Sequence, residues 1–405
     1  MQIIMENKKY FLIFLILLLI QEYYNEKAQF IQLELKVIRY IRHFKKDYIS
    51  KKHFEKQIPS LTKYIKFLKN NFTKFDYYDY INNPKISFIA SVFNKENYLS
   101  TLIKSIQLQL LKEFEIIFVD DYSTDKSIEI IEKFQKSDKR IKLFKNKKNM
   151  GSLYTRYFGA INAIGEYIIF IDSDDIVLKE GIINAYNHLK KKNLDMVEFH
   201  SVFDNVTEIY ISTRYYKYKN IIYQPVLSYI FYYDINKGDE QNTALWDKLI
   251  RKETVKKSLN YIGEKYFIEK IIIENDVLLL FSLFQNSNSF QYIDELGYYY
   301  FIQNNNSISN TKYGPNRADE IIHSIFINIK FLYDNTKETV LDKYFCLFKL
   351  DQAYIRYKDF FIYINKEYDL IETVLNKLLI SKNISNENKL KIQLIKFELL
   401  KNKKN

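Results

Sequence analysis

Short apolar runs alternate with helical patterns between residues 84 and 200. Four runs have the length and the β-branched and aromatic content of buried strands, namely Ile86–Phe93, Phe114–Val119, Arg140–Phe144 and Glu166–Ile171. Three stretches between them carry apolar residues at steps of three and four, namely Leu99–Leu111, Asp125–Phe134 and Ser152–Ala163. This alternation predicts an α/β domain with a mostly parallel sheet and helices on both faces.

Helical patterns without strand-like runs flank this domain. Before it, residues 21–83 carry an apolar helical stripe that Pro59 interrupts, and the breaker Asn82-Asn83-Pro84 marks the predicted boundary. After it, residues 317–405 carry further stripes, one of them formed by Ile321, Ile325, Ile329 and Leu332. We therefore expect a helical stem over 21–83 and a helical carboxy-terminal region over 317–405.

The amino terminus holds an apolar run, Tyr10–Ile20, that follows Lys8 and Lys9. The run is shorter than the roughly 20 residues of a membrane-spanning helix, and no small-residue cleavage pattern follows it. It predicts a short uncleaved signal anchor over residues 1–20, with a cleaved signal peptide and a buried helix as alternatives. The preceding lysines place the amino terminus in the cytosol. The expected location is the membrane of the Golgi or ER with the main domain luminal; the alternatives are secretion and peripheral attachment at the cytoplasmic face.

The formal charge of +12 is concentrated in the stem. Residues 36–74 contain twelve Lys or Arg but only two acids, Asp47 and Glu55. This excess indicates either attraction to an anionic membrane surface or the solvated face of a stem. Because no nucleic-acid-binding motif accompanies the charge, we expect no nucleic-acid partner. The single cysteine, Cys346, excludes an intrachain disulfide framework.

Acidic residues follow two of the predicted strands. Asp120 and Asp121 follow the second strand, and Asp172-Ser173-Asp174-Asp175 follows the fourth. In open α/β sheets ligands bind beyond the carboxyl ends of the strands, so both clusters should lie at the ligand edge. Carboxylates this close repel one another unless a positive group lies between them. The Asp-x-Asp spacing of Asp172 and Asp174 predicts Mn²⁺ or Mg²⁺ carrying a diphosphate.

The sequence around these strands resembles the family-2 glycosyltransferases, which have the GT-A fold. The matching stretches are SVFNKENYLSTLIKSIQLQ, FEIIFVDDYSTDKS and NMGSLYTRYFGAINAIGEYIIFIDSDD, followed later by LWDKLIRKE, IIENDVLLLFSLF and YYYFIQNNNSI. The resemblance covers about residues 85 to 310. It implies a nucleotide-sugar-binding half over 84–200 and an acceptor-side half over 201–316.

The resemblance also implies roles for individual residues. The implied nucleotide-sugar contacts are Phe93, Asn94, Asp121 (at the uracil ring), Arg156 (near the phosphates), Asp172 (near ribose and metal) and Ser173. Asp174 corresponds to the direct metal ligand, with Asp172 as its partner. Asp276 corresponds to the catalytic base. Glu274 is the runner-up for that role, because Asn275 stands inside the family's usual Glu-Asp pair.

The implied function is an inverting, metal-dependent, non-processive hexosyl or N-acetylhexosaminyl transfer. The implied donor is a nucleotide diphosphate sugar, with UDP as the expected nucleotide, and the acceptor is a hydroxyl of a glycan, lipid or protein. A catalytically inactive nucleotide-sugar- or carbohydrate-binding protein of the same fold is the alternative.

Departures from the family occur at Ser91, Tyr122 and Tyr157. Trp246 corresponds to an aromatic residue beneath the acceptor site, but a core position is equally consistent with its sequence. The oligomeric state is left open.

Overall fold

The computed structural model describes the chain from residue 79 to 380 with gaps. The described ranges are 79–204, 209–211, 221–224, 244–273, 275–301, 318–335 and 368–380, with the single residues 63, 66, 68, 389, 392, 393 and 396. The chain divides into two units, Met1–Tyr48 and Ile49–Asn405, and all described residues lie in the second. The predicted signal segment, most of the predicted stem and Glu274 lie outside the described residues.

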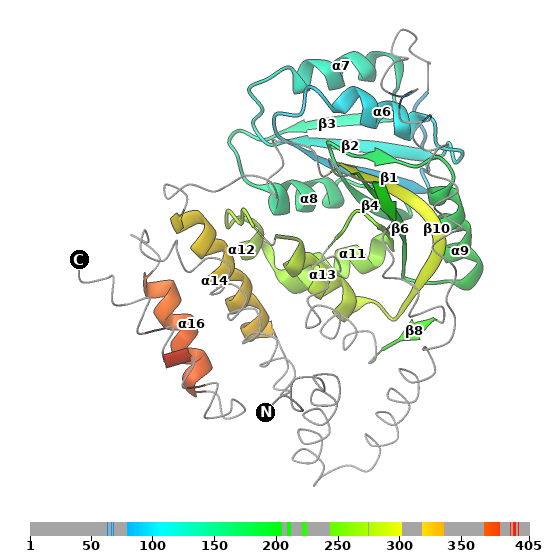
Figure 1. Cartoon of the computed structure of the whole chain (residues 1–405). Helices are drawn as coiled ribbons and strands as arrows, with labels where there is room; N and C mark the ends of the chain where they lie inside the picture. Colours follow the sequence, from blue (N-terminus) through cyan, green and yellow to red (C-terminus); the bar gives the residue numbers. More distant parts are fainter. Residues whose placement is uncertain are drawn as a thin grey trace. The chain divides into compact units, whose positions relative to one another are not determined.

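A ten-stranded sheet forms the centre of the described part, in the order β3-β2-β1-β4-β9-β6-β10-β5, with β7 paired to β6 and β8 to β10 (Figure 1). The strands are β1 (Ile86–Val92), β2 (Phe114–Asp120), β3 (Ile141–Lys145), β4 (Tyr167–Asp172), β5 (Ile176–Val177), β6 (Met196–Asp204), β7 (Ile209–Ile211), β8 (Ile222–Tyr223), β9 (Lys248–Arg251) and β10 (Ser289–Phe301). β1 to β4 run parallel, and β9 is antiparallel to both of its neighbours, β4 and β6. β6 and β10 are parallel to each other, so the long strands all end at the same edge of the sheet.

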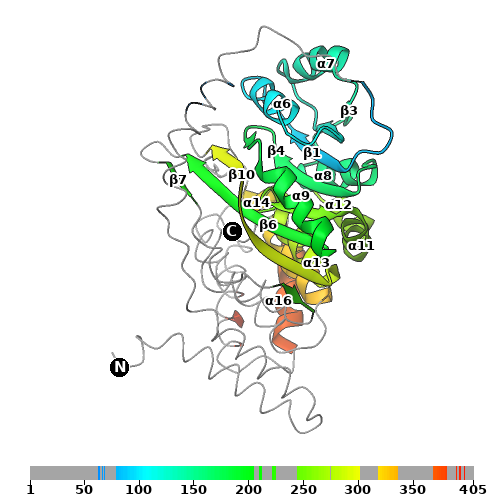
Figure 2. The ribbon, with the colours of Figure 1, turned by 90° about the vertical axis from the view of Figure 1, so that its right-hand side faces the viewer.

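Helices cover both faces of this sheet (Figures 1 and 2). Their bounds are α6 (Leu99–Gln107), α7 (Ser127–Ser137), α8 (Ser152–Ile161), α9 (Gly181–Lys192), α11 (Lys252–Ile262), α12 (Glu264–Phe267), α13 (Asn275–Asn286), α14 (Ala318–Asn335) and α16 (Tyr368–Ile380). α6, α7 and α9 share one apolar core with β1, β2 and β4. α8 packs on the other face of β1 and β2, and α11 and α13 pack against α8.

Alternation along β1 explains why both faces need helices. Phe88 packs edge-on against Phe114 in the core beneath α6 and α7, with ring centroids 5.4 Å apart. Ile89, the next residue, points to the opposite face and touches Gly159 of α8 so closely that a Cβ at that position would collide with it. Both Phe88 and Ile89 are buried, as expected for a strand covered on two sides.

The predicted α/β fold is confirmed, with its four strands and three helices at the predicted places. The sequence did not predict β9, a short antiparallel strand that enters the sheet between β4 and β6. The apolar stripe Ile321, Ile325, Ile329 and Leu332 is buried on α14, which packs against α13 and α16. The domain limits proposed from the sequence stay predictions.

Candidate active site

The acidic clusters meet at the carboxyl edge of the sheet, as predicted. β1 lies between β2 and β4, and Val92 pairs with Asp120 while Ser91 pairs with Asp172. Asp121 and the turn after Asp172 therefore flank the end of β1. Ser91 also accepts a hydrogen bond from Thr155 of α8, with 2.6 Å between the two hydroxyl oxygens, which ties the helix to this edge.

Asp121 holds the segment that leads into α8. Its carboxylate accepts hydrogen bonds from the backbone N–H groups of Met150 (2.7 Å) and Gly151 (2.8 Å) and from the Asn146 amide (2.9 Å). Gly151 has a φ of 89°, a conformation that favours glycine. Asp121 is itself 3% exposed. The predicted contact with uracil stays a prediction, and the structure adds a loop-holding role that the sequence did not reveal.

The loop after β1 is bonded to the loop after β2. Asn94, with a φ of 52°, accepts the Thr124 N–H at 2.8 Å through its side chain and donates its own N–H to Ser123 at 3.0 Å. The Lys95 N–H donates to the Ser127 hydroxyl at 2.8 Å. Phe93, just before this junction, leaves 46% of its surface exposed. An exposed ring on a well-anchored loop is suited to the predicted nucleotide contact, which stays a prediction.

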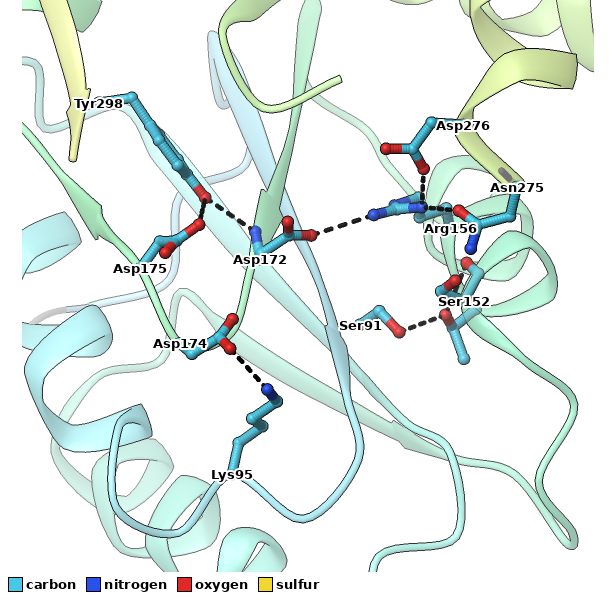
Figure 3. A network of polar contacts seen from close by, with 11 residues as sticks. Ser91, Lys95, Ser152, Arg156, Asp172, Asp174, Asp175, Asn275, Asp276 and Tyr298 are labelled. Carbon is cyan, nitrogen blue, oxygen red and sulfur yellow. Dashed lines mark hydrogen bonds and ion pairs between the residues drawn. The ribbon is translucent and has the colours of Figure 1, made fainter. Parts of the chain in front are cut away.

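The two carboxylates of the Asp-x-Asp motif each have a cationic partner (Figure 3). Asp172 accepts a hydrogen bond from Arg156 Nη2 at 3.0 Å, and Asp174 forms an ion pair with Lys95 Nζ at 2.6 Å. These cations offset the repulsion between the two carboxylates that the sequence indicated.

The remaining residues of the acidic turn are buried. Asp175 accepts the hydroxyl of Tyr298 at 2.9 Å and the backbone N–H of Phe301 at 3.0 Å, and it is 2% exposed. Ser173 is also 2% exposed. The third carboxylate of the cluster therefore has hydrogen-bonding partners on β10 rather than a cationic one, and the predicted contact of Ser173 with the donor stays a prediction.

Arg156 joins the acidic turn to the start of α13. Its Nη1 group donates to Asn275 Oδ1 at 2.7 Å and to Asp276 Oδ1, while Nη2 contacts Asp172 (Figure 3). Burial lowers the pKa of Arg156, but the carboxylates of Asp276 and Asp172 outweigh it and raise that pKa above its ordinary value. Residues more than one hundred positions apart therefore converge on one buried guanidinium, which stays charged.

Asp276 has the proton affinity of a base that works near neutral pH. Burial has the largest effect on the pKa of this carboxyl and raises it. The Arg156 charge lowers this pKa and the Asp172 charge raises it, and the net result is a pKa of about 6. Burial also raises the pKa of Asp172, Arg156 lowers it, and Asp174 raises it further. Asp276 lies in the first turn of α13, whose following residues Val277 to Phe284 are all buried. The helix is therefore firmly packed behind the carboxylate.

Asp172 and Asp174 suit a divalent cation that also binds a diphosphate. Among the described residues, no group of three or more His, Cys, Asp or Glu side chains is arranged to hold a metal ion. Mg²⁺ in nucleotide sites usually takes only one or two protein carboxylates and completes its shell with water and phosphate oxygens. Asp172 and Asp174 are close enough for Asp174 to raise the pKa of Asp172, and the Asp172 side chain is 31% exposed. Two oxygen ligands at an accessible edge fit such an ion.

Trp246 is buried beside the acidic turn. Its ring stacks on those of Tyr298 and Tyr300, with centroids 4.8 Å and 5.3 Å apart, and it is 8% exposed. His200, also buried, has its Nε2 3.0 Å from Asp294 rather than in the acidic site. These contacts indicate a structural role for His200.

Sequence reasoning missed four residues of this site. Lys95 binds Asp174, Asn275 binds Arg156, and Asp175 and Tyr298 bind each other. The sequence carried only weak signals for them, since Lys95 follows Asn94 and Asp175 extends the Asp-x-Asp cluster. Tyr298 lies far along the chain, and its partner depends on β10 pairing with β5.

Comparison with known families matches the part of the chain that carries the acidic turn and Arg156. The model of glycosyl transferase family 2 matches residues 87–257. This segment is a family 2 glycosyltransferase domain. The match spans β1 to β9 and part of α11, which include Asp121, Arg156 and the acidic turn. Asp276 lies beyond the matched residues and reaches the site through Arg156.

Bacterial glycosyltransferases are similar to this chain over part of their length. Over 225 residues it is 32% identical to a cholesterol galactosyltransferase of Borreliella burgdorferi, an alignment that covers 53% of this chain and 61% of that protein. Over 123 residues it is 40% identical to an uncharacterized glycosyltransferase of Haemophilus influenzae, covering 30% of this chain and 49% of that protein. The chain thus spans less than two thirds of these relatives.

The fold also matches a solved structure. S. aureus TarS, residues 1–349, in complex with UDP-GlcNAc, aligns with a TM-score of 0.55 and 19% sequence identity. The alignment covers 78% of this chain and 88% of that one. This likeness confirms the predicted GT-A fold.

The predicted location in the Golgi or ER is wrong. These relatives are bacterial proteins, and bacteria have neither compartment. Among the described residues, no helix is long and apolar enough to cross a membrane. The apolar run Tyr10–Ile20, on which the anchor rested, lies outside those residues.

Proposed function

We propose that this protein transfers a hexose or an N-acetylhexosamine from a UDP-sugar to an acceptor hydroxyl. The observation that carries the proposal is the convergence on Arg156 of Asp172, from the end of β4, and Asp276, from the start of α13. One carboxylate belongs to the Asp-x-Asp turn on the donor side, and the other has the pKa of a general base. A single displacement needs a charge sink for the leaving group and a base for the nucleophile.

Asp276 is the proposed general base. An acceptor hydroxyl must lose its proton as the new glycosidic bond forms, and a carboxylate whose pKa approaches the working pH accepts that proton efficiently. With a pKa of about 6, Asp276 is ionised at neutral pH and is still a better base than an ordinary aspartate. The Arg156 guanidinium holds the carboxylate in place and limits the rise of its pKa. A single displacement with this base would invert the anomeric carbon.

The leaving side falls to the acidic turn. Asp174 and Asp172 would hold Mn²⁺ or Mg²⁺, which supplies positive charge to the departing diphosphate. Two cationic side chains lie at the same edge. Lys95 forms an ion pair with Asp174, and Arg156 forms one with Asp172. The exposed ring of Phe93 and the carboxylate of Asp121 at the adjacent strand ends would contact the nucleoside. The diphosphate and the nucleoside of the donor thereby each have partners of suitable chemistry.

The names of relatives support a hydroxyl acceptor. One relative is named as a cholesterol galactosyltransferase and another, from Bacillus spizizenii, as a poly(ribitol-phosphate) beta-glucosyltransferase. Both acceptors are alcohols, and both transferred groups are hexoses. A glycan, a lipid or a protein with a free hydroxyl is therefore the proposed acceptor class.

The proposal is tested by release of UDP from a panel of UDP-hexoses and UDP-N-acetylhexosamines, with Mn²⁺ and with EDTA. We expect Mn²⁺-dependent turnover of at least one donor, because water can replace the acceptor slowly. The result that would support the alternative, an inactive binding protein, is calorimetric binding of UDP without turnover of any donor. Absence of both binding and turnover would contradict a donor site altogether.

The pKa of Asp276 predicts the acidic limb of the pH–rate profile. Only the carboxylate form accepts a proton, so kcat/KM should fall about tenfold for each pH unit below about 6 and level off above it. The sign follows from the raised pKa, since an ordinary aspartate would place this limb about two units lower. Initial rates of UDP release between about pH 4.5 and 8 test this, with Tm followed in parallel to exclude unfolding. A profile flat down to about pH 5 would contradict the assignment.

A further inference from the structure

The acidic turn after β4 is held from β10 by one tyrosine hydroxyl. The Asp172 N–H donates to the Tyr298 oxygen at 3.0 Å, and the Tyr298 O–H donates to Asp175 Oδ2 at 2.9 Å (Figure 3). Asp175 Oδ1 accepts the Phe301 N–H at 3.0 Å, and the Asp175 N–H closes the turn on the Asp172 carbonyl at 3.2 Å. Both ends of the Asp172–Asp175 turn are therefore attached to β10.

The ring of the same tyrosine stacks on the ring of Trp246. The Trp246 and Tyr298 rings are nearly parallel, at 16°, with centroids 4.8 Å apart. Tyr298 is fully buried, so neither its hydroxyl nor its ring faces solvent. One side chain thus contacts the turn that carries Asp172 and Asp174 and also the ring of Trp246.

We propose that Tyr298 and Asp175 are positioning residues for donor binding. Together they set the separation of Asp172 and Asp174. The Tyr298 hydroxyl is the shared partner of the first and last residues of the turn, and Asp174 lies between them. Asp175 is thus assigned to the support of the turn rather than to the ion, while Asp172 and Asp174 present the ligand oxygens. This inference rests on the proposed function and goes beyond it by naming what holds the donor site in shape.

The neighbouring tyrosine provides a matched control. Tyr299 is 2% exposed, and its hydroxyl donates to Asp204 Oδ2 at 2.8 Å. Side chains alternate along a strand, so Tyr299 lies on the other face of β10 and packs in a separate apolar cluster with Ile176 and Val202. Tyr299→Phe removes a partly buried hydrogen bond between a tyrosine and an aspartate, whereas Tyr298→Phe removes a buried one; only Tyr298→Phe changes the hydrogen bonds of the turn.

The test is calorimetric binding of UDP at a series of Mn²⁺ concentrations to the wild type, Tyr298→Phe and Tyr299→Phe. In Tyr298→Phe we expect the Mn²⁺ concentration that gives half of the metal-dependent gain in affinity to rise about tenfold, because a positioning hydrogen bond to the ligand turn is lost. UDP affinity in EDTA should stay within about twofold of the wild type, since the ring and the nucleoside contacts remain. Tyr299→Phe should match the wild type in both conditions while losing a similar amount of thermal stability.

Three outcomes would overturn the inference. The first is an unchanged Mn²⁺ concentration at half of the gain in UDP affinity in Tyr298→Phe. The second is a shift of this concentration in Tyr299→Phe as large as that in Tyr298→Phe. The third is an affinity of the wild type for UDP that does not depend on Mn²⁺. If Tyr298→Phe fails to fold, Asp175→Asn replaces it and should show the same shift in midpoint. A wild type that binds no UDP at any Mn²⁺ concentration overturns the proposed function itself, and this inference with it.

Discussion

Asp276→Asn is expected to lower kcat for UDP release by about 10²–10⁴-fold, the usual effect of removing a general base. The amide cannot accept the proton of the acceptor, but it can still accept a hydrogen bond from Arg156, so the packing of α13 should survive. The affinity for UDP with Mn²⁺ should be nearly unchanged, because the change lies on the acceptor side of Arg156. Steady-state kinetics and calorimetry of the same preparation measure the two effects separately.

Two further variants distinguish the base from its neighbours. Glu274→Gln tests the runner-up and should lower kcat far less than Asp276→Asn. Asp319→Asn removes an acid from the first turn of α14, a comparable helical position outside the site, and should behave as the wild type. If Glu274→Gln is inactive while Asp276→Asn remains active, the catalytic base is Glu274 rather than Asp276.

Asp174→Ala is expected to abolish metal-dependent turnover and the gain in UDP affinity that Mn²⁺ confers. The variant removes one of two proposed ligand oxygens and leaves Lys95 without the carboxylate that it binds at 2.6 Å. The side chains of this ion pair are only 15% and 13% exposed, so its loss leaves a largely buried Lys95 ammonium and should lower thermal stability. Calorimetry of UDP with and without Mn²⁺, and the circular dichroism of the variant, give the two measurements.

Asp195→Ala is the matched control for this substitution. Asp195 has a similarly buried side chain and is also ion-paired, at 3.3 Å to Arg251, but it precedes β6 at the opposite edge of the sheet. Its removal should leave both UDP binding and turnover unchanged. Equal losses in the two variants would mean that Asp174 acts through stability rather than as a ligand.

Local patterns were sufficient to predict the strands and helices around the donor edge. Both faces of β1 and β4 are buried, which fits the mostly apolar runs Ile86–Phe93 and Glu166–Ile171. Such runs can be recognised from the local sequence without knowing which strands pair with them. The acids that follow them could be placed at one edge because the strands that end there are parallel. The strand pattern alone was therefore enough to bring Asp121, Asp172 and Asp174 together.

Contacts that depend on distant pairing could not be predicted in the same way. β9 is only four residues long and is defined by its antiparallel pairing with β4 and β6, which are distant from each other in the sequence. Tyr298 reaches Asp175 because β10 pairs with β5, a two-residue strand with no legible pattern. Lys95 lies in the loop after β1, and Arg156 and Asn275 lie on α8 and α13, so their polar contacts depend on tertiary packing that the sequence pattern does not reveal. The supports of the acidic turn were therefore missed, although the turn itself was found.

The most decisive measurement on the donor site is a crystal structure of the protein with UDP and Mn²⁺, with anomalous scattering recorded at the manganese edge. If the carboxyl edge around Arg156 is the donor site and Asp174 holds its metal, an anomalous peak should be bonded to the Asp174 carboxylate and to the diphosphate. The uracil should lie near Phe93 and Asp121. A peak on other residues, or UDP bound elsewhere on the chain, would contradict both assignments.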